Sequence, residues 1–175
     1  MILNVAQNNA RPYFTGPTIA VLANTNYEEN IMTSLLIVAH GSRRHQANRS
    51  MQQLAKKVAC HLPMNVDDVR VGFLEFTQPS VQSCIDDCFN NGTYQLLVLP
   101  YFLAQGNHVS KDIPNEIAAA KGKWPTKRIH LLPHIGEMEE MSSLIAKRCL
   151  ETLINNHEFT PPQSMPKYYE LEISR

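Results

Sequence analysis

The sequence predicts an α/β protein built as a doubly wound, parallel four-stranded sheet with helices on both faces. Two observations predict this fold. Short apolar runs alternate four times with stretches in which apolar residues recur at helical spacing. The runs themselves are apolar at nearly every position, which is typical of strands that are buried on both faces. Because each alternation implies a right-handed crossover, we expect the four strands to lie parallel in one sheet.

The first half of the pattern contains two strands and two helices. Residues 35–39 are predicted as the first strand and residues 69–74 as the second. The helix between them should end near Pro63, and its apolar positions share one face: Met51, Leu54, Val58 and Leu62. The next helix has apolar residues at i, i+3, i+4, i+7 and i+8, namely Val81, Cys84, Ile85, Cys88 and Phe89. It should end at the Asn-Asn-Gly sequence that follows.

The second half repeats the pattern. Residues 96–99 are predicted as the third strand, which Pro100 ends, and residues 128–132 as the fourth. A shorter helix should follow Pro114. The last predicted helix carries five residues on one face: Met138, Met141, Leu144, Ile145 and Cys149.

Three segments of the chain differ in composition. Residues 1–31 are rich in Asn and Thr, contain Pro12 and Pro17 and have no apolar period, so we expect a flexible N-terminal extension. Residues 155–175 include three prolines in FTPPQSMPKYY and are expected to form a flexible C-terminal tail. The residues between them, 32–154, suffice for one domain with a single hydrophobic core.

Charge and hydropathy exclude several classes of protein. The 16 Lys and Arg residues balance 16 Asp and Glu residues, so the formal net charge is zero. A general nucleic-acid or membrane binder normally carries a basic excess, so we expect neither kind of partner. No apolar run approaches the roughly 18–20 residues that cross a bilayer. The first residues also lack the basic and apolar regions of a secretory signal, so a cytoplasmic location is expected.

The positions of the cysteines are typical of a protein from a reducing compartment. All four lie in predicted helices and lack the spacing of a disulfide framework: Cys60, Cys84, Cys88 and Cys149. Cys84 and Cys88 fall on an apolar helical stripe, so we expect them to pack in the core. A metal or iron–sulfur site at this pair is the alternative.

Three of the predicted strands lead into a residue that could bind a metal or move a proton. His40 ends the first strand, Glu75 follows the second, and His108 lies in the loop after the third. In an open parallel sheet the carboxyl ends of the strands share one edge, where ligands bind, so these three side chains should converge. Two imidazoles and a carboxylate suit a divalent ion such as cobalt, nickel, iron or zinc. A neutral imidazole can also accept a proton.

Each of these residues also has a purely structural interpretation. His40 could be a turn or capping residue, Glu75 could help to start the next helix, and His108 could be an exposed loop histidine. Other chemistries find less support, since AHGSRR lacks the lysine of a phosphate-binding loop and no Gly-x-Ser-x-Gly sequence occurs. Ser42 has no evident base, which disfavours a hydrolase or phosphatase.

Four blocks of the sequence resemble the small single-domain chelatases of the CbiX/SirB type, which act on sirohydrochlorin. The blocks occur in the order of that family and span roughly residues 34–153: LLIVAHGSR, VGFLEFTQPSV, LLVLPYFLAQGNHVSKDIP and LLPHIGE. The resemblance implies a chelatase-like single lobe that works as a homodimer without ATP and without a prosthetic group. It would insert cobalt or iron, with nickel as a further candidate, into sirohydrochlorin for cobalamin or siroheme biosynthesis.

The resemblance also implies roles for individual residues. The metal-handling and catalytic residues would be His40, Glu75 and His108, with His40 as the proton acceptor. The substrate-binding residues would be Gly41, Arg43, Arg44, Leu103, Ala104, Gln105, Gly106, Asn107 and Lys111. In that set the basic side chains would meet the carboxylates of the tetrapyrrole, and the glycines would let the backbone approach its ring. His134 departs from the family pattern and receives no role. A non-catalytic carrier of metal or tetrapyrrole, using the same site, is the alternative function.

Overall fold

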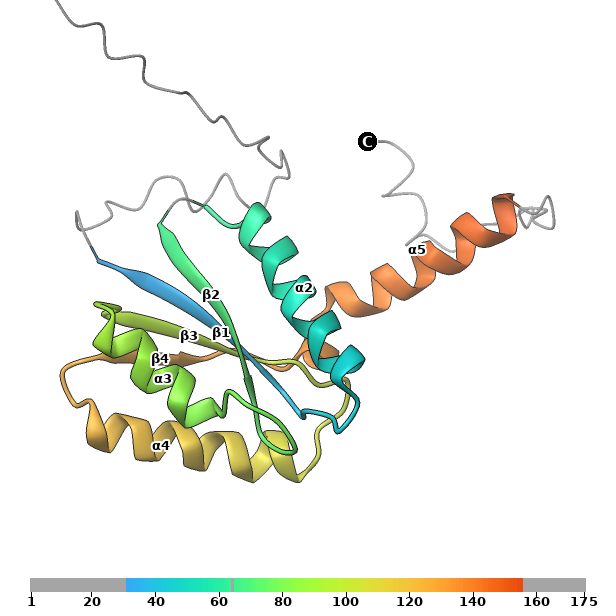
Figure 1. The fold of residues 1–175 in the computed structure, drawn as a ribbon. Coiled ribbons are helices and arrows are strands. Elements are labelled where there is room, and N and C mark those ends of the chain that lie inside the picture. The colour runs from blue at the N-terminus through green and yellow to red at the C-terminus, as the bar shows by residue number, and fades with distance from the viewer. Residues whose placement is uncertain (1–30, 64, 156–175) are drawn as a thin grey trace, which may run out of the picture. The chain divides into compact units, whose positions relative to one another are not determined.

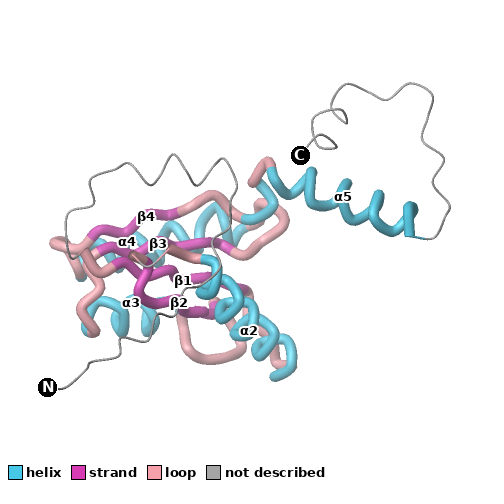
Figure 2. The backbone as a smooth tube through the Cα atoms, turned by 90° about the horizontal axis from the view of Figure 1, so that it is seen from above, coloured by secondary structure: helices cyan, strands magenta, loops and turns pink. Residues whose placement is uncertain are grey.

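The computed structural model describes residues 31–63 and 65–155, and it divides into two units, Met1–Glu137 and Met138–Arg175. Residues 1–30 and 156–175, on which the expected flexible extension and tail rest, lie outside the described residues. In the first unit four strands form one sheet: β1 (Thr33–Ala39), β2 (Val66–Phe73), β3 (Gln95–Pro100) and β4 (Arg128–Leu131). All pairings are parallel. The strands lie in the order β2-β1-β3-β4, which can be followed in Figure 2. The predicted doubly wound parallel sheet is confirmed.

Helices cover both faces of this sheet. In Figure 1, α3 (Val81–Asn90) and α4 (Ile113–Lys123) lie below the sheet, and α2 (His45–His61) lies above it. Successive residues of β1 contribute to opposite sides. Leu36 packs into the core cluster of α3 and α4, and Ile37 packs into the cluster of α2. This alternation explains why the central strand is apolar at every position from Leu35 to Ala39.

The predicted helical stripes face the sheet. All five apolar residues of the α3 stripe are at most 4% exposed. Ser80 caps the N-terminus of α3, because its hydroxyl accepts a hydrogen bond from the Ser83 N–H at 3.2 Å. The helix ends before Gly92, which has a φ of +99°. Helix α4 carries Pro114 as its second residue and follows the π-helical turn His108–Asp112 without a break.

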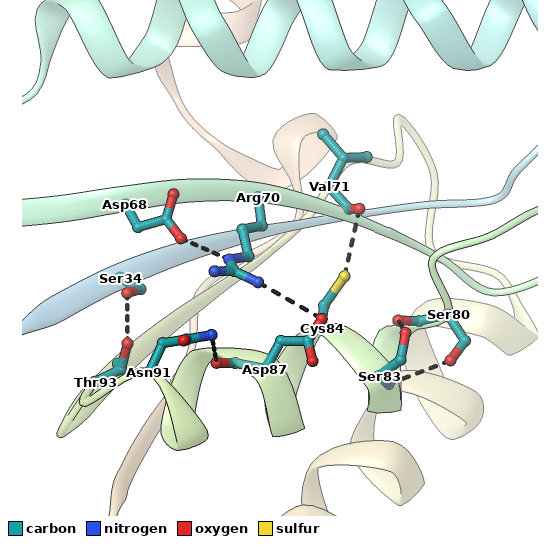
Figure 3. A network of polar contacts seen from close by, with 10 residues as sticks. All are labelled: Ser34, Asp68, Arg70, Val71, Ser80, Ser83, Cys84, Asp87, Asn91 and Thr93. Atoms are coloured by element: carbon teal, nitrogen blue, oxygen red, sulfur yellow. Dashed lines mark hydrogen bonds and ion pairs between the residues drawn. The ribbon is translucent and has the colours of Figure 1, made fainter.

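Cys84 and Cys88 are core residues, as expected. They are 2% and 1% exposed, and burial raises the pKa of each thiol to about 11. The Cys84 thiol points to the Val71 carbonyl at 3.5 Å, and Figure 3 shows this contact beside the Arg70 side chain. Arg70 pairs with Asp68 and lies 3.7 Å from Asp87. No third metal ligand joins the two cysteines among the described residues, so the alternative metal or iron–sulfur site finds no support.

The second unit holds α5 (Glu140–Asn155), the last predicted helix. It begins later than the apolar pattern suggested. Met138 lies in the bend that follows a 3-10 turn at Ile135–Glu137, so it is outside the helix. None of the described helices is long and apolar enough to cross a membrane.

Candidate active site

The three residues predicted at the strand ends lie together. One potential ligand atom each from His40, Glu75 and His108 can be chosen so that all three lie within 4.8 Å of one another. The Nε2 atom of His108 is 3.8 Å from Oε1 of Glu75, and the imidazole centroids of His40 and His108 are 4.9 Å apart. It is the one such cluster among the described residues. The convergence expected from the parallel-sheet rule is therefore present.

Backbone hydrogen bonds beyond the strands fix this arrangement. Ala39 lies opposite Phe73 at the end of the β1–β2 ladder. The pairing continues as the Leu74 N–H donates to the Ala39 carbonyl at 3.0 Å and the Glu75 N–H donates to the His40 carbonyl at 2.9 Å. Main-chain hydrogen bonds therefore hold His40 next to Glu75, and no contact between their side chains is needed to bring them together.

Gly41 has a structural reason within the protein, in addition to the expected ligand role, which remains a prediction. Its φ is +90°, and a Cβ added to it would lie 2.0 Å from the Glu75 carbonyl oxygen. The loops after β1 and β2 thus pack backbone against backbone, and glycine is required by the protein itself. A Cβ at Gly106 would meet no atom within 4 Å, so the clearance expected there for a ligand remains a prediction.

The block that contains His134 supports the loop after β3. A Cβ added to Gly136 would lie 1.9 Å from the Leu103 carbonyl oxygen, and the Gly136 N–H donates to the Phe102 carbonyl at 2.9 Å. His134 is 8% exposed, with Nδ1 3.1 Å from Oε2 of Glu137. The sequence analysis missed this support, although the glycine in LLPHIGE was its visible sign.

Asp112 is a site residue that the sequence analysis also missed. Its Oδ2 lies 2.7 Å from Nδ1 of His108, four residues earlier in a π-helical turn (His108–Asp112) that leads into α4. An ionised carboxylate only accepts hydrogen bonds, so Nδ1 of the neutral ring must carry the hydrogen. The lone pair is then on Nε2, the atom nearer to Glu75. The signal in the sequence was the four-residue spacing in HVSKD.

The predicted substrate-binding residues lie in the same segments as His40 and His108. Arg43 and Arg44 follow β1, and Lys111 lies in the same turn as His108. Neither Arg44 nor Lys111 has an ion pair in the described part of the chain. Residues 103–107 are exposed, with Leu103 at 74%. These side chains are free to meet a ligand, and their assigned roles remain predictions.

The fold and this cluster define a class: an α/β protein with an open site of two histidines and one glutamate at the ligand-binding edge of a parallel sheet. A sequence model of the CbiX family matches residues 34–152, and the chain belongs to that family.

Three curated relatives carry the names of related enzymes. The sirohydrochlorin cobaltochelatase of Sulfurisphaera tokodaii is 31% identical over 122 residues, which are 70% of this chain and 95% of that protein. The sirohydrochlorin ferrochelatase of Bacillus subtilis is 28% identical over 66% of this chain but 43% of its own length. A third, the sirohydrochlorin cobaltochelatase of Methanococcus maripaludis, is 34% identical over 52% of this chain and 62% of its own. The match thus leaves out more than a third of two of these relatives.

Solved structures of CbiX and SirB proteins are also similar to this chain. The sirohydrochlorin chelatase SirB from Bacillus subtilis subspecies spizizenii, in complex with cobalt, superposes with a TM-score of 0.61 at 28% identity. The match covers 69% of this chain and 50% of that one. The CbiX protein from Marinobacter aquaeolei has a TM-score of 0.60 at 24% identity and covers 70% of this chain and 98% of its own, which supports the fold alone.

Proposed function

We propose that this protein is a chelatase that inserts a divalent metal ion into sirohydrochlorin without ATP. The observation that carries the proposal is the cluster of His40, Glu75 and His108, whose ligand atoms lie within 4.8 Å of one another at an exposed edge. The names of the relatives supply the substrate class. Cobalt and iron are the two candidate ions, because relatives are named for both.

The cluster suits the chemistry of metal insertion. Two pyrrole protons must leave the macrocycle, and the ion must lose water. Imidazole nitrogens and a carboxylate oxygen are suitable ligands for cobalt and iron as substrates, and three protein ligands leave positions open for pyrrole nitrogens. In this proposal His40 accepts a proton, His108 holds the ion and Glu75 offsets its charge.

The cations that follow β1 suit a substrate with several carboxylates. Residues 31–66 contain no Asp or Glu, and Arg43 and Arg44 lie between His40 and the start of α2. Both side chains are exposed. Helix α2 begins in this segment, with no acidic residue in its first turn and no side-chain cap from Arg44. Cations at the positive end of a helix are locally unfavourable, and an anionic ligand would offset that cost.

A second copy of the chain would complete the site. A single lobe offers one wall to a large planar macrocycle, so we propose a homodimer. Sedimentation at micromolar concentration should give about twice the 19.8 kDa chain mass, and a monomer that turns over would contradict this. The pathway, cobalamin or siroheme biosynthesis, and the cytoplasmic location remain predictions.

Turnover separates this enzyme from a carrier that uses the same site. Purified protein would be incubated anaerobically with excess sirohydrochlorin and cobalt, iron or nickel, and metallation would be followed by absorbance. A chelatase produces many equivalents of metallated product per chain, above the rate without protein. A carrier stops at one equivalent, and that result would overturn the proposed function.

A further inference from the structure

The loop after β2 places a large apolar side chain beside the site. Phe76 is 52% exposed, and its ring centroid lies 5.5 Å from that of His40, with the ring planes at 72°. The guanidinium carbon of Arg43 lies 5.1 Å from the Phe76 centroid. Single exposed apolar residues are common on protein surfaces, so exposure alone does not indicate a role. The backbone of Phe76 gives the stronger indication.

Phe76 adopts a conformation that its side chain disfavours. Its φ is +62°, and it is the one non-glycine residue with a positive φ in the part of the chain that the structure describes. The Thr77 N–H donates to the Glu75 carbonyl at 2.8 Å, which closes a γ-turn with Phe76 at its centre. A positive φ at that position marks the rare, strained form of this turn, and it is a genuine outlier for a bulky residue.

Core packing does not explain this strain. Phe76 belongs to neither hydrophobic cluster of the first unit. Its ring contacts are with His40 and Arg43, a residue of the metal-handling cluster and a predicted substrate ligand. Glycine would adopt the turn without strain, as Gly41 does in the neighbouring loop. A strained aromatic residue that is retained outside the core, at a site, indicates a functional contact.

We propose that Phe76 and Arg43 form a binding subsite for the tetrapyrrole. The ring of Phe76 contacts the flat face of one pyrrole unit, and Arg43, which lies against that ring, binds a carboxylate at its periphery. Aromatic rings associate in offset or edge-to-face geometry, and a guanidinium can stack on an aromatic face while its N–H groups bind a carboxylate. The inference rests on the proposed function, because a conjugated macrocycle with peripheral carboxylates offers both contacts.

A structural role for Phe76 would have different consequences. If the ring only orients His40, its loss would slow turnover and leave the affinity for the tetrapyrrole unchanged. If it forms the subsite, its loss would weaken binding even when no metal is present. Binding of the metal-free tetrapyrrole therefore separates the two roles.

The experiment measures the Kd of metal-free sirohydrochlorin by fluorescence quenching for four variants. Phe76→Gly removes the ring and the strain, Phe76→Ala removes the ring alone, and Phe76→Tyr keeps the ring. Tyr94→Ala is the matched control. Tyr94 is an aromatic residue, 36% exposed, that directly precedes β3 at the amino end of the strand, and the Arg128 guanidinium lies 5.5 Å from its ring. Thermal unfolding of each variant is recorded in parallel.

Loss of the ring should raise the Kd about tenfold, as expected when one aromatic contact is removed. Phe76→Gly should do so while melting at or above the wild-type temperature, because it relieves the strained φ. Phe76→Tyr and Tyr94→Ala should bind like the wild type. Should Phe76→Gly fail to fold, Phe76→Ala and Phe76→Tyr still decide the question.

Two results would overturn the inference in distinguishable ways. If the wild type binds sirohydrochlorin and Phe76→Gly or Phe76→Ala binds it with the same Kd, the subsite is excluded and the proposed function stands. A wild-type protein that does not bind sirohydrochlorin would remove the proposed function and the subsite together.

Discussion

The Nδ1 atom of His108 and the Oδ2 atom of Asp112 are 2.7 Å apart, in one π-helical turn. This contact fixes the neutral imidazole with its hydrogen on Nδ1 and its lone pair on Nε2. It also makes the ring a better ligand, as carboxylates hydrogen-bonded to metal-binding histidines generally do. In the proposed function, where His108 holds the ion, Asp112 would act on the metal substrate through His108 without touching the ion.

We expect Asp112→Ala to raise the metal concentration needed for half-maximal insertion by about 10–100-fold. The rate at saturating metal should fall much less, because His40 and Glu75 are unchanged. Nitrogen-15 NMR of the histidine rings should show the lone pair on Nε2 of His108 in the wild type and a mixture of tautomers in the variant.

Two further variants sharpen this test. In Asp112→Asn the side-chain oxygen can still accept the Nδ1 hydrogen, so the tautomer should persist while the charge is lost. Asp86→Ala is the control, because Asp86 pairs with Lys123 and Trp124 on the surface between α3 and α4. An Asp112→Ala protein with normal metal dependence and unchanged ring nitrogens would contradict the role assigned to Asp112.

The two histidines should differ when each is removed. His40→Ala should lose about 10² or more in turnover, which is typical of the loss of a general base. His108→Ala should raise the required metal concentration about tenfold or more and keep some activity at saturating metal. Glu75→Gln should fall between them, since the amide keeps the shape and loses the charge. Initial rates over a range of metal concentrations measure all three, and near-normal rates in both folded histidine variants would exclude the site.

The sheet and the main cluster could be predicted because both follow from short-range patterns. Continuous apolar runs predicted the strands, and the carboxyl ends of parallel strands share the edge toward which His40, Glu75 and His108 lead. The conformations of the loops could not be predicted in this way. The positive φ of Phe76 and the approach of Gly136 to Leu103 arise from contacts between segments distant in sequence. Residue spacing carries little information about such contacts.

The same limit explains why the backbone contact of Gly41 was not predicted. A glycine after a strand can serve a ligand or a backbone contact, and the sequence pattern is the same for both. Only the position of the Glu75 carbonyl, 2.0 Å from where a Cβ would lie, shows that the second reason applies. Asp112 was overlooked for a related reason, since a four-residue spacing becomes a hydrogen bond only in a particular helical turn.

The buried thiols predict how stability depends on alkaline pH. Burial raises the pKa of Cys84 and Cys88 to about 11 in the folded protein, above the ordinary thiol value of 9.0. The contribution of the two protonated thiols to the free energy of unfolding is fully present below pH 9, where the thiols are protonated in both the folded and the unfolded state. It is lost as the pH rises from 9 to 11, because the unfolded chain releases protons that the folded protein retains. Urea unfolding of the wild type and of Cys84→Ala should show a smaller loss across this range in the variant, and equal slopes would contradict the prediction.

Gly41 and Gly106 give a matched pair of substitutions in the two loops of the site. Gly41→Ala should destabilise the protein by at least about 1–3 kcal/mol, the typical cost of one strained backbone residue, because its φ is +90° and its Cβ would meet the Glu75 carbonyl at 2.0 Å. It should also separate His40 from Glu75 and lower turnover. Gly106→Ala adds the same methyl group where no atom lies within 4 Å, so its free energy of unfolding should stay within about 1 kcal/mol of the wild type. Denaturant unfolding measures both changes, and equal stabilities for the two variants would show that the backbone contact between the first two loops does not hold the site together.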